Sequence, residues 1–164
     1  MDIREHSVEA KNAIIAHLST DLIGSGAYRH VYGLAGRPDC VLKVEYGQGT
    51  HSQFHNVAEW HTWCEVEQTQ WAKWFAPCVS IDGVGVSMVQ RRTQPLTEWP
   101  QAIRESGLPA LFTDVKLANW GLLDGRAVCH DYGYNSLMPR GLRRVKMVPL
   151  SVFTGPMAPY RDAA

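Results

Sequence analysis

The sequence has no long apolar run and no excess of charge of either sign. No stretch stays apolar over the roughly 18 residues that a membrane-spanning helix needs, and the N-terminal residues MDIREHSVEA lack the positive and then apolar pattern of a signal peptide. Lysine and arginine together number 16, as do aspartate and glutamate, so no overall basic field would attract nucleic acid. We therefore expect a soluble, cytoplasmic protein that binds neither membranes nor nucleic acid.

Cysteine is also sparse, and its spacing fits no disulfide framework. The chain has four cysteines and no CxxC pair, whereas secreted disulfide-rich domains need dense, paired spacing. Three histidines lie near Cys64 in the sequence: His51, His55 and His61. Their spacing matches no compact zinc finger, and we interpret them as surface and helix-end residues. The cysteines are expected to be buried, reduced thiols.

The composition and the N-terminal half predict a small globular protein with many strands. An apolar content of 45% in 164 residues excludes global disorder and suits one domain or two small lobes. Apolar residues at helical spacing predict a short helix over 7–18. Glycines and Pro38 then separate short β-type segments that predict hairpin-connected strands: 22–23, 31–32 and 41–44.

One long helix is expected after these strands, from about residue 52 to residue 75. Apolar residues recur there at steps of three, four or seven until Pro77 ends the pattern. The expected helix contains four tryptophans: Trp60, Trp63, Trp71 and Trp74. Because so many indoles on one helix are hard to bury, we expect most of them in the core and some in a homodimer or host-protein contact.

Short strands and turns make up the second half. Further β-type segments are expected in pairs: 79–81 with 85–90, and 121–123 with 127–129. Asp124 and Gly125 lie between the last two and are a strong hairpin signal, while residues 96–108 leave room for at most one short helix. Residues 134–164 are expected to form an irregular basic tail that includes Arg140, Arg143, Arg144 and Lys146.

The first chemical motif is a glycine turn followed by a lysine in an apolar strand. The turn consists of Gly24, Ser25 and Gly26. Glycines let backbone N–H groups approach a phosphate closely, although most such turns are only tight turns. Lys43 lies in the strand that follows, where a lysine is more often exposed. A glutamate of the next helix could hold its ammonium over a phosphate, with Glu59 at the expected distance and Glu65 and Glu67 as reserve choices.

Two further motifs flank the predicted hairpin around residues 121–129. Asp114 and Asn119 precede it, and the segment Asp131-Tyr132-Gly133 follows it. A hairpin brings its two ends together, so a carboxylate, an amide oxygen and a second carboxylate could converge there. Oxygen ligands of this kind are what Mg²⁺ prefers. Each piece is common by itself, but their joint occurrence in this order is specific.

These pieces, taken in order over residues 21–133, resemble the protein-kinase signature set. The resemblance implies a minimal α+β, protein-kinase-like fold. Its five-stranded antiparallel N-lobe with one long helix would cover residues 1–92, and a reduced C-lobe would cover residues 93–133. The small size is similar to that of kinase-like proteins encoded by bacteriophages, which would place the protein in the host cytoplasm.

The resemblance also implies how ATP would bind. Gly24, Ser25 and Gly26 would cover its phosphates. Val31, Val41 and residues 89–92 would frame the adenine between the lobes. Lys43, oriented by Glu59, would hold the α- and β-phosphates.

The catalytic roles that the resemblance implies fall on the second half of the chain. Asp114 would accept or orient the proton of the substrate hydroxyl, and Lys116 would stabilise the γ-phosphoryl oxygens, as in Ser/Thr rather than Tyr kinases. Asn119 and Asp131 would hold Mg²⁺. The resemblance thus implies an ATP- and Mg²⁺-dependent Ser/Thr protein phosphotransferase that acts on host proteins or on itself.

Several departures from the kinase pattern favour a different class of function. Arg29 replaces the third glycine of the turn, and Phe112-Thr113 replace the His-Arg that usually precedes the catalytic aspartate. Val41 stands where a smaller alanine is usual. Residues 134–164 contain no A-P-E motif, so a peptide-docking lobe is not expected. The alternative is a kinase-like nucleotide-binding or pseudokinase module that binds and inhibits a host protein. A small-molecule kinase is less favoured, because no residues remain for a substrate lobe.

Overall fold

A computed structural model describes residues 3–45, 54–133, 141–142 and 145–154. In chain order its elements are α1 (Ile3–Leu18), β1 (Ser19–Ser25), β2 (Arg29–Leu34), β3 (Arg37–Glu45), α2 (His55–Val66), η2 (Ala72–Trp74), β4 (Cys78–Ile81), β5 (Ser87–Arg91), β6 (Gln94–Pro95), α3 (Gln101–Ser106), β7 (Leu108–Pro109), η3 (Leu117–Asn119), β8 (Trp120–Leu123), β9 (Arg126–Cys129), β10 (Met147–Val148) and α5 (Ser151–Thr154). The fold is a mixed α+β arrangement, as the sequence predicted.

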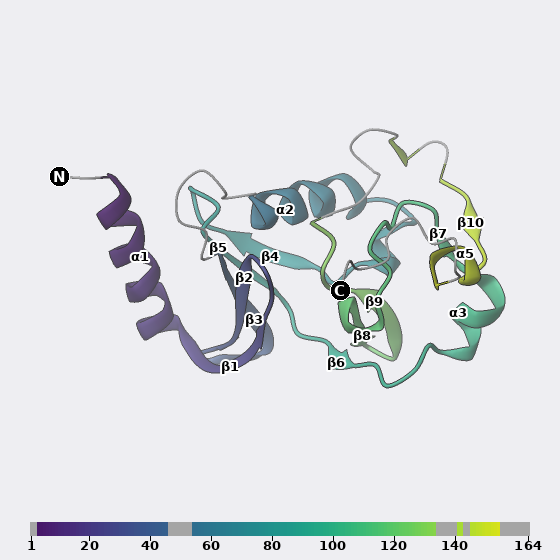
Figure 1. Cartoon of the computed structure of the whole chain (residues 1–164), viewed down its shortest axis with the longest axis horizontal. Coiled ribbons are helices and arrows are strands. Elements are labelled where there is room, and N and C mark those ends of the chain that lie inside the picture. The colour runs from purple at the N-terminus through teal and green to yellow at the C-terminus, as the bar shows by residue number, and fades with distance from the viewer. Residues whose placement is uncertain (1–2, 46–53, 134–140, 143–144, 155–164) are drawn as a thin grey trace.

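The largest sheet is five-stranded and antiparallel, which confirms the expectation for the first half of the chain. Its strand order is β1-β2-β3-β5-β4. The strands β1, β2 and β3 follow one another as hairpins, and β3 then pairs with β5 from Cys40 opposite Arg91 to Val44 opposite Ser87. The chain between β3 and β5 contains α2, which packs against β3 and β4. In Figure 1, α2 lies along this sheet while α1 extends away from it.

The expected long helix over 52–75 is wrong, because α2 ends at Val66. The physical reason is a local competitor for the helix. Thr69 donates both its backbone N–H and its hydroxyl to the Val66 carbonyl, each at 2.8 Å, and its hydroxyl oxygen accepts a bond from the Trp71 N–H. Such side-chain bonds offer the backbone an alternative to continued helix.

The four tryptophans therefore do not share one helix. Trp60 and Trp63 belong to α2, whereas Trp71 directly precedes η2 and Trp74 ends it. All four are partly buried and pack against the hydrophobic core. The helical spacing continued past Val66 because both segments cover the same core.

A smaller three-stranded sheet, β6-β8-β9, follows in the chain. Its β8–β9 hairpin turns at Asp124 (φ 51°) and Gly125 (φ 76°), and two successive positive φ angles are the signature of the predicted tight hairpin turn. β7 pairs with β10. The expected irregular tail, 134–164, therefore contains a strand and the short helix α5 in its described part, while Arg140, Arg143 and Arg144 lie outside the described residues.

The core joins the two sheets. Its largest fully buried side chains include Trp120 from β8, Phe75 after η2, Met88 from β5 and Tyr132 after β9. The ring of Phe75 meets that of Tyr132 edge to face, with centroids 4.9 Å apart. Segments far apart in the sequence are thus held together by one apolar cluster, which includes Tyr132 of the Asp131–Gly133 motif.

The cysteines are reduced, and the expectation of burial holds for three of them. Cys40, Cys78 and Cys129 are buried, whereas Cys64 is exposed on α2. Burial raises the pKa of the Cys78 thiol to about 12. Within the described residues, no helix combines the length and apolar character needed to cross a membrane.

Candidate functional site

The centre of the site is an ion pair between β3 and α2. Lys43 Nζ lies 2.8 Å from Glu59 Oε2, and the two side chains are only 4% and 0% exposed. The structure therefore selects Glu59 from the three glutamates that the sequence left open, while Glu65 and Glu67 are exposed. Burial alone would raise the pKa of Glu59, but the adjacent Arg29 and Lys43 charges outweigh it and hold that pKa well below its usual range.

Arg29, the first residue of β2, is the second cation of the cluster. Its Nη2 lies 2.8 Å from Glu59 Oε1 and 2.7 Å from Asp131 Oδ1, and its Nη1 donates to Asn56 Oδ1 at 3.2 Å. The side chain is buried, at 8% exposure. Burial works against the charged guanidinium, yet the Glu59 and Asp131 carboxylates outweigh it and raise the pKa of Arg29.

Sequence analysis assigned Arg29 no role beyond replacing a glycine. A signal was present in the alternation of β2. Val31 is paired with Lys43 in the sheet, so these two side chains share a face, and Arg29, two residues before Val31, lies on that face as well. Val31 was predicted to face the nucleotide, so its near neighbour Arg29 could have been assigned to the same site.

The segment after β9 completes the cluster from the other sheet. Lys43 Nζ also donates to the His130 carbonyl, and the Tyr132 backbone N–H donates to Glu59 Oε1 at 2.9 Å. Asp131, between them, is half exposed. Gly133 lies tightly against the start of α2, because an added Cβ would lie 3.1 Å from His55 Nδ1 and His55 would have to shift by a few tenths of an ångström. Predicted motifs from both halves of the chain therefore meet in the structure.

The predicted catalytic residues Asp114 and Lys116 and the predicted metal ligand Asn119 lie together beside this cluster. Asn119 Nδ2 donates to Asp114 Oδ2 at 3.0 Å, and Lys116 Nζ lies 3.7 Å from Asp114 Oδ1. The His130 N–H donates to the Asn119 carbonyl at 2.8 Å, which ties this group to the segment containing Asp131. The structure thus holds the two ends of the β8–β9 hairpin together, as the sequence predicted.

His130 is a half-buried support that the sequence did not indicate. Its ring is 2.8 Å from Thr93 Oγ1 through Nδ1 and 2.9 Å from the Ala118 carbonyl through Nε2. Burial and the nearby Lys43 charge lower the pKa of this imidazole. The ring thus joins Thr93, in the segment between β5 and β6, to the loop that contains Ala118 and Asn119.

The glycine turn lies at the open end of β1. A Cβ at Gly24 would meet nothing within 4 Å, and one at Gly26 would be 3.9 Å from the nearest atom, the Arg29 carbonyl oxygen. Neither φ falls in the left-handed range, so the folded backbone itself does not require glycine at either position. The turn closes through the Gly26 N–H and the Arg29 carbonyl, 2.9 Å apart. Tyr28 in the turn stacks on His55 with ring centroids 4.4 Å apart.

His55 is the first residue of α2, as expected for a helix-end histidine, but it is buried rather than exposed. Its ring stacks on Tyr28, and burial lowers its pKa. His61 is exposed and His51 lies outside the described residues. Among the described residues no group of three or more histidine, cysteine, aspartate or glutamate side chains could hold a metal ion.

The residues expected to frame adenine lie on neighbouring strands. Val41 is buried and pairs with Gly33 and with Gln90, while Val31 on β2 is half-buried. The predicted hinge, 89–92, begins in β5 and ends where the Arg92 N–H donates to the Asp39 carbonyl at 2.8 Å. Because β6 follows at once and pairs with β8, this segment is the link between the five-stranded and three-stranded sheets.

The donor chemistry of the site fits Mg²⁺ only when other oxygens complete the ligand set. Asn119 turns its amide nitrogen to Asp114, which leaves its amide oxygen for an ion. Asp131 already gives Oδ1 to Arg29 and has Oδ2 for another ligand. One amide and one carboxylate oxygen are hard ligands of the type that Mg²⁺ takes together with phosphate and water oxygens.

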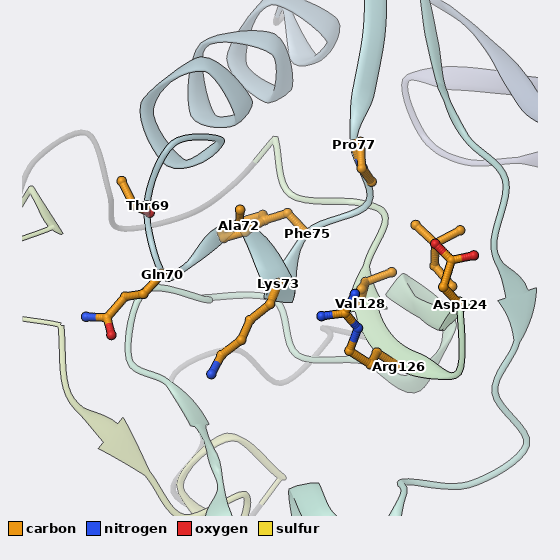
Figure 2. A pocket seen from close by; sticks show the side chains of 10 residues that line it. Thr69, Gln70, Ala72, Lys73, Phe75, Pro77, Asp124, Arg126 and Val128 are labelled. Atoms are coloured by element: carbon orange, nitrogen blue, oxygen red, sulfur yellow. The ribbon is translucent and has the colours of Figure 1, made fainter.

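A separate cavity of about 440 Å³ lies between η2 and the β8–β9 hairpin. Figure 2 shows Lys73 and Arg126 on either side of it, with Asp124 at the hairpin turn. None of the residues predicted to bind ATP or metal lines this cavity. It is therefore distinct from the cluster around Glu59.

Comparisons with known proteins add no assignment: no family model matches the chain, and no curated protein matches its sequence. The chemistry of the site must be argued from its geometry. The cluster combines two buried cations with a buried and a half-exposed carboxylate, and the Asp114–Lys116–Asn119 group lies beside it. Fixed cations of this kind can share the charge of an anionic ligand.

Proposed function

We propose that the protein is an ATP- and Mg²⁺-dependent Ser/Thr protein kinase-like phosphotransferase. The observation that supports this most is the Lys43–Glu59 pair, 2.8 Å long and almost fully buried, with Asp131 joined to it through Arg29. A lysine held by a helix glutamate beside a carboxylate after a hairpin is the arrangement that orients nucleotide phosphates in kinases. The proposed protein substrate belongs to a bacterial host or is the chain itself, and the proposed site of action is the cytoplasm.

Each group has a distinct part in the proposed reaction. Lys43, restrained by Glu59, binds the α- and β-phosphates at the end of a strand that leaves it little freedom. Asp114 accepts or orients the hydroxyl proton of the substrate, and Lys116, whose Nζ is 3.7 Å from Asp114, stabilises charge on the transferred phosphoryl group. Mg²⁺, held by Asn119 and Asp131, supplies charge neutralisation when it is bound with the nucleotide.

The proposal explains why glycine stands at the open end of β1. Neither packing nor backbone conformation requires Gly24 or Gly26 in the protein alone. A phosphate bound against this turn would explain the need for glycine, because a side chain there would keep the backbone N–H groups away from the phosphate.

One observation favours the second candidate function, a nucleotide-binding module that inhibits a host protein. Arg29 pairs with Asp131, the carboxylate that the kinase function requires as a metal ligand, with Nη2 2.7 Å from Asp131 Oδ1. A site that is held in this state would bind a nucleotide without transferring phosphate. Inhibition of the host protein would then come from a protein contact.

Transfer of labelled γ-phosphate from Mg·ATP, alone and with bacterial lysate, separates the two functions. The proposal expects labelled bands with the wild type and their loss in Asp114→Asn and Asp131→Asn. Asp124→Asn is the matched control, because it removes the same charge from an exposed hairpin turn in which asparagine also tolerates a positive φ. No labelling with wild-type protein, while Asp114→Asn retains the biological effect, would favour the binding module.

A further inference from the structure

Four charged groups at the centre of the site are joined by short contacts, and the buried Glu45 carboxylate, opposite Arg29 in the sheet, also acts electrostatically on Arg29. Glu59 gives one oxygen to Lys43 and the other to Arg29, and Arg29 continues to Asp131. Two cations thus face two carboxylates along one chain of short contacts. Asp131 is the only one of the four that is half exposed, with 51% of its side chain accessible, against 8% or less for the others.

We propose that Arg29 and a divalent cation compete for Asp131, so that Arg29 sets the metal affinity of the site. This inference rests on the proposed function only in taking Asp131 as a metal ligand. A guanidinium remains charged at every accessible pH, and its hydrogen bond to a carboxylate is among the strongest that side chains form. A cation that binds Asp131 must therefore either displace Arg29 or tolerate a positive charge that lies 2.7 Å from the shared carboxylate.

The position of Arg29 also places the displaced guanidinium within reach of a second anionic partner, a phosphate bound at the glycine turn. The Arg29 carbonyl closes the glycine turn through the Gly26 N–H, at 2.9 Å, so the guanidinium is attached at the base of the loop that would cover the phosphates. A bound polyphosphate would provide a new anionic partner for Arg29 next to its present one. Nucleotide would then favour the state in which Asp131 is available, and metal and nucleotide would bind more tightly together than separately.

A purely structural role for Arg29 makes a different prediction. If Arg29 only stabilised the contact between the sheets, its removal would lower stability without raising the affinity for a cation. Competition makes the opposite prediction for affinity, because removing one competitor strengthens the binding of the other. Metal affinity thus separates the two roles even though both predict a loss of stability.

The experiment is a titration with Mn²⁺ alone, without nucleotide, followed by electron paramagnetic resonance of the free ion. We expect weak binding by the wild type and binding about tenfold tighter or more by Arg29→Gln, the factor that corresponds to about 1.4 kcal/mol. Arg37→Gln is the matched control, because it breaks an exposed arginine–aspartate pair in the same sheet, with Nε 3.0 Å from Asp39 Oδ1. The tight binding should vanish when Asp131→Asn is added to Arg29→Gln.

The inference is overturned if Arg29→Gln binds Mn²⁺ no more tightly than wild type or Arg37→Gln, or if none of these proteins binds it. Because the titration contains no ATP, a failure of phosphate transfer leaves its outcome unaffected, and the failures of the two proposals remain distinguishable.

A second measurement uses the wild-type protein and so does not depend on the folding of Arg29→Gln, in which the buried Glu59 has fewer partners. The Arg29 Nε–Hε signal is followed by NMR during addition of Mg²⁺. Competition predicts that the chemical shift of Arg29 Nε–Hε moves toward that of an exposed arginine as Mg²⁺ is added. The size of this change should follow the change in the Asp131 signals at each Mg²⁺ concentration. Movement of the Asp131 signals with no change at Arg29, or no change at either residue, would contradict the inference.

Discussion

Glu59→Gln is the substitution for which the structure predicts the largest effect on stability. The Glu59 side chain is 0% exposed and accepts bonds from Lys43 Nζ at 2.8 Å, Arg29 Nη2 at 2.8 Å and the Tyr132 N–H at 2.9 Å. Glutamine keeps the shape but not the charge, and its amide group would point hydrogen atoms at one of the two cations. Breaking a buried ion pair by removing one partner typically costs about 3–5 kcal/mol.

Urea denaturation at pH 7, followed by circular dichroism, measures this cost. With a urea m-value of about 2 kcal/mol/M, the expected loss lowers the unfolding midpoint by about 2 M, with the slope unchanged. Glu98→Gln is the matched control, since Glu98 pairs with Arg104 at 3.4 Å on the surface and its side chain is 76% exposed. That pair should contribute less than about 1 kcal/mol. A loss in Glu59→Gln as small as in Glu98→Gln would refute the reasoning.

Three further predictions follow from burial and local space. Gly24→Ala should leave the free energy of unfolding within about 0.5 kcal/mol of wild type while weakening ATP binding measured by calorimetry. Gly121→Ala is the contrasting variant and should destabilise the fold, because a Cβ there would lie 2.4 Å from Thr93 Oγ1. Because the pKa of Glu59 is lowered in the folded state, its contribution is present above the unfolded pKa of about 4.3 and is lost as pH falls below it. Urea midpoints should thus fall more steeply below about pH 5 in wild type than in Glu59→Gln, and equal slopes would count against the buried pair. A thiol reagent should modify exposed Cys64 in the native state but reach buried Cys78 only on unfolding; equal rates would show that Cys78 is accessible.

The strands and turns could be predicted because their signals are local. Asp124 and Gly125 both need positive φ in a two-residue hairpin turn, and the sequence supplies the two residue types that accept it. The order of the motifs also predicted that Lys43 would meet a helix glutamate and that the two ends of the hairpin, with Asn119 and Asp131, would come together. These expectations depended on which residues the strands and the hairpin bring together, and the structure brings them together.

The end of α2 and the partners of Arg29 could not be predicted in the same way. Helical spacing continues through the tryptophans after Val66, and only the hydrogen bonds of Thr69 reveal that the chain has left the helix. The alternation of β2 places Arg29 on the face of Lys43, but it does not identify the partners of Arg29, because Glu59 and Asp131 lie 30 and 102 positions away in the sequence. The choice of Glu59 over Glu65 likewise depended on the rotation of a helix, which tertiary packing decides.

ATP binding by calorimetry, in the presence of Mg²⁺, tests most directly whether the cluster around Glu59 is a nucleotide site. The wild type should show saturable binding, and Lys43→Met should abolish it while circular dichroism still reports a folded chain. Lys73→Met should bind like wild type, because Lys73 lines the separate cavity between η2 and the β8–β9 hairpin. Wild-type protein that binds no ATP, or binding that persists in Lys43→Met and is lost in Lys73→Met, would contradict the account.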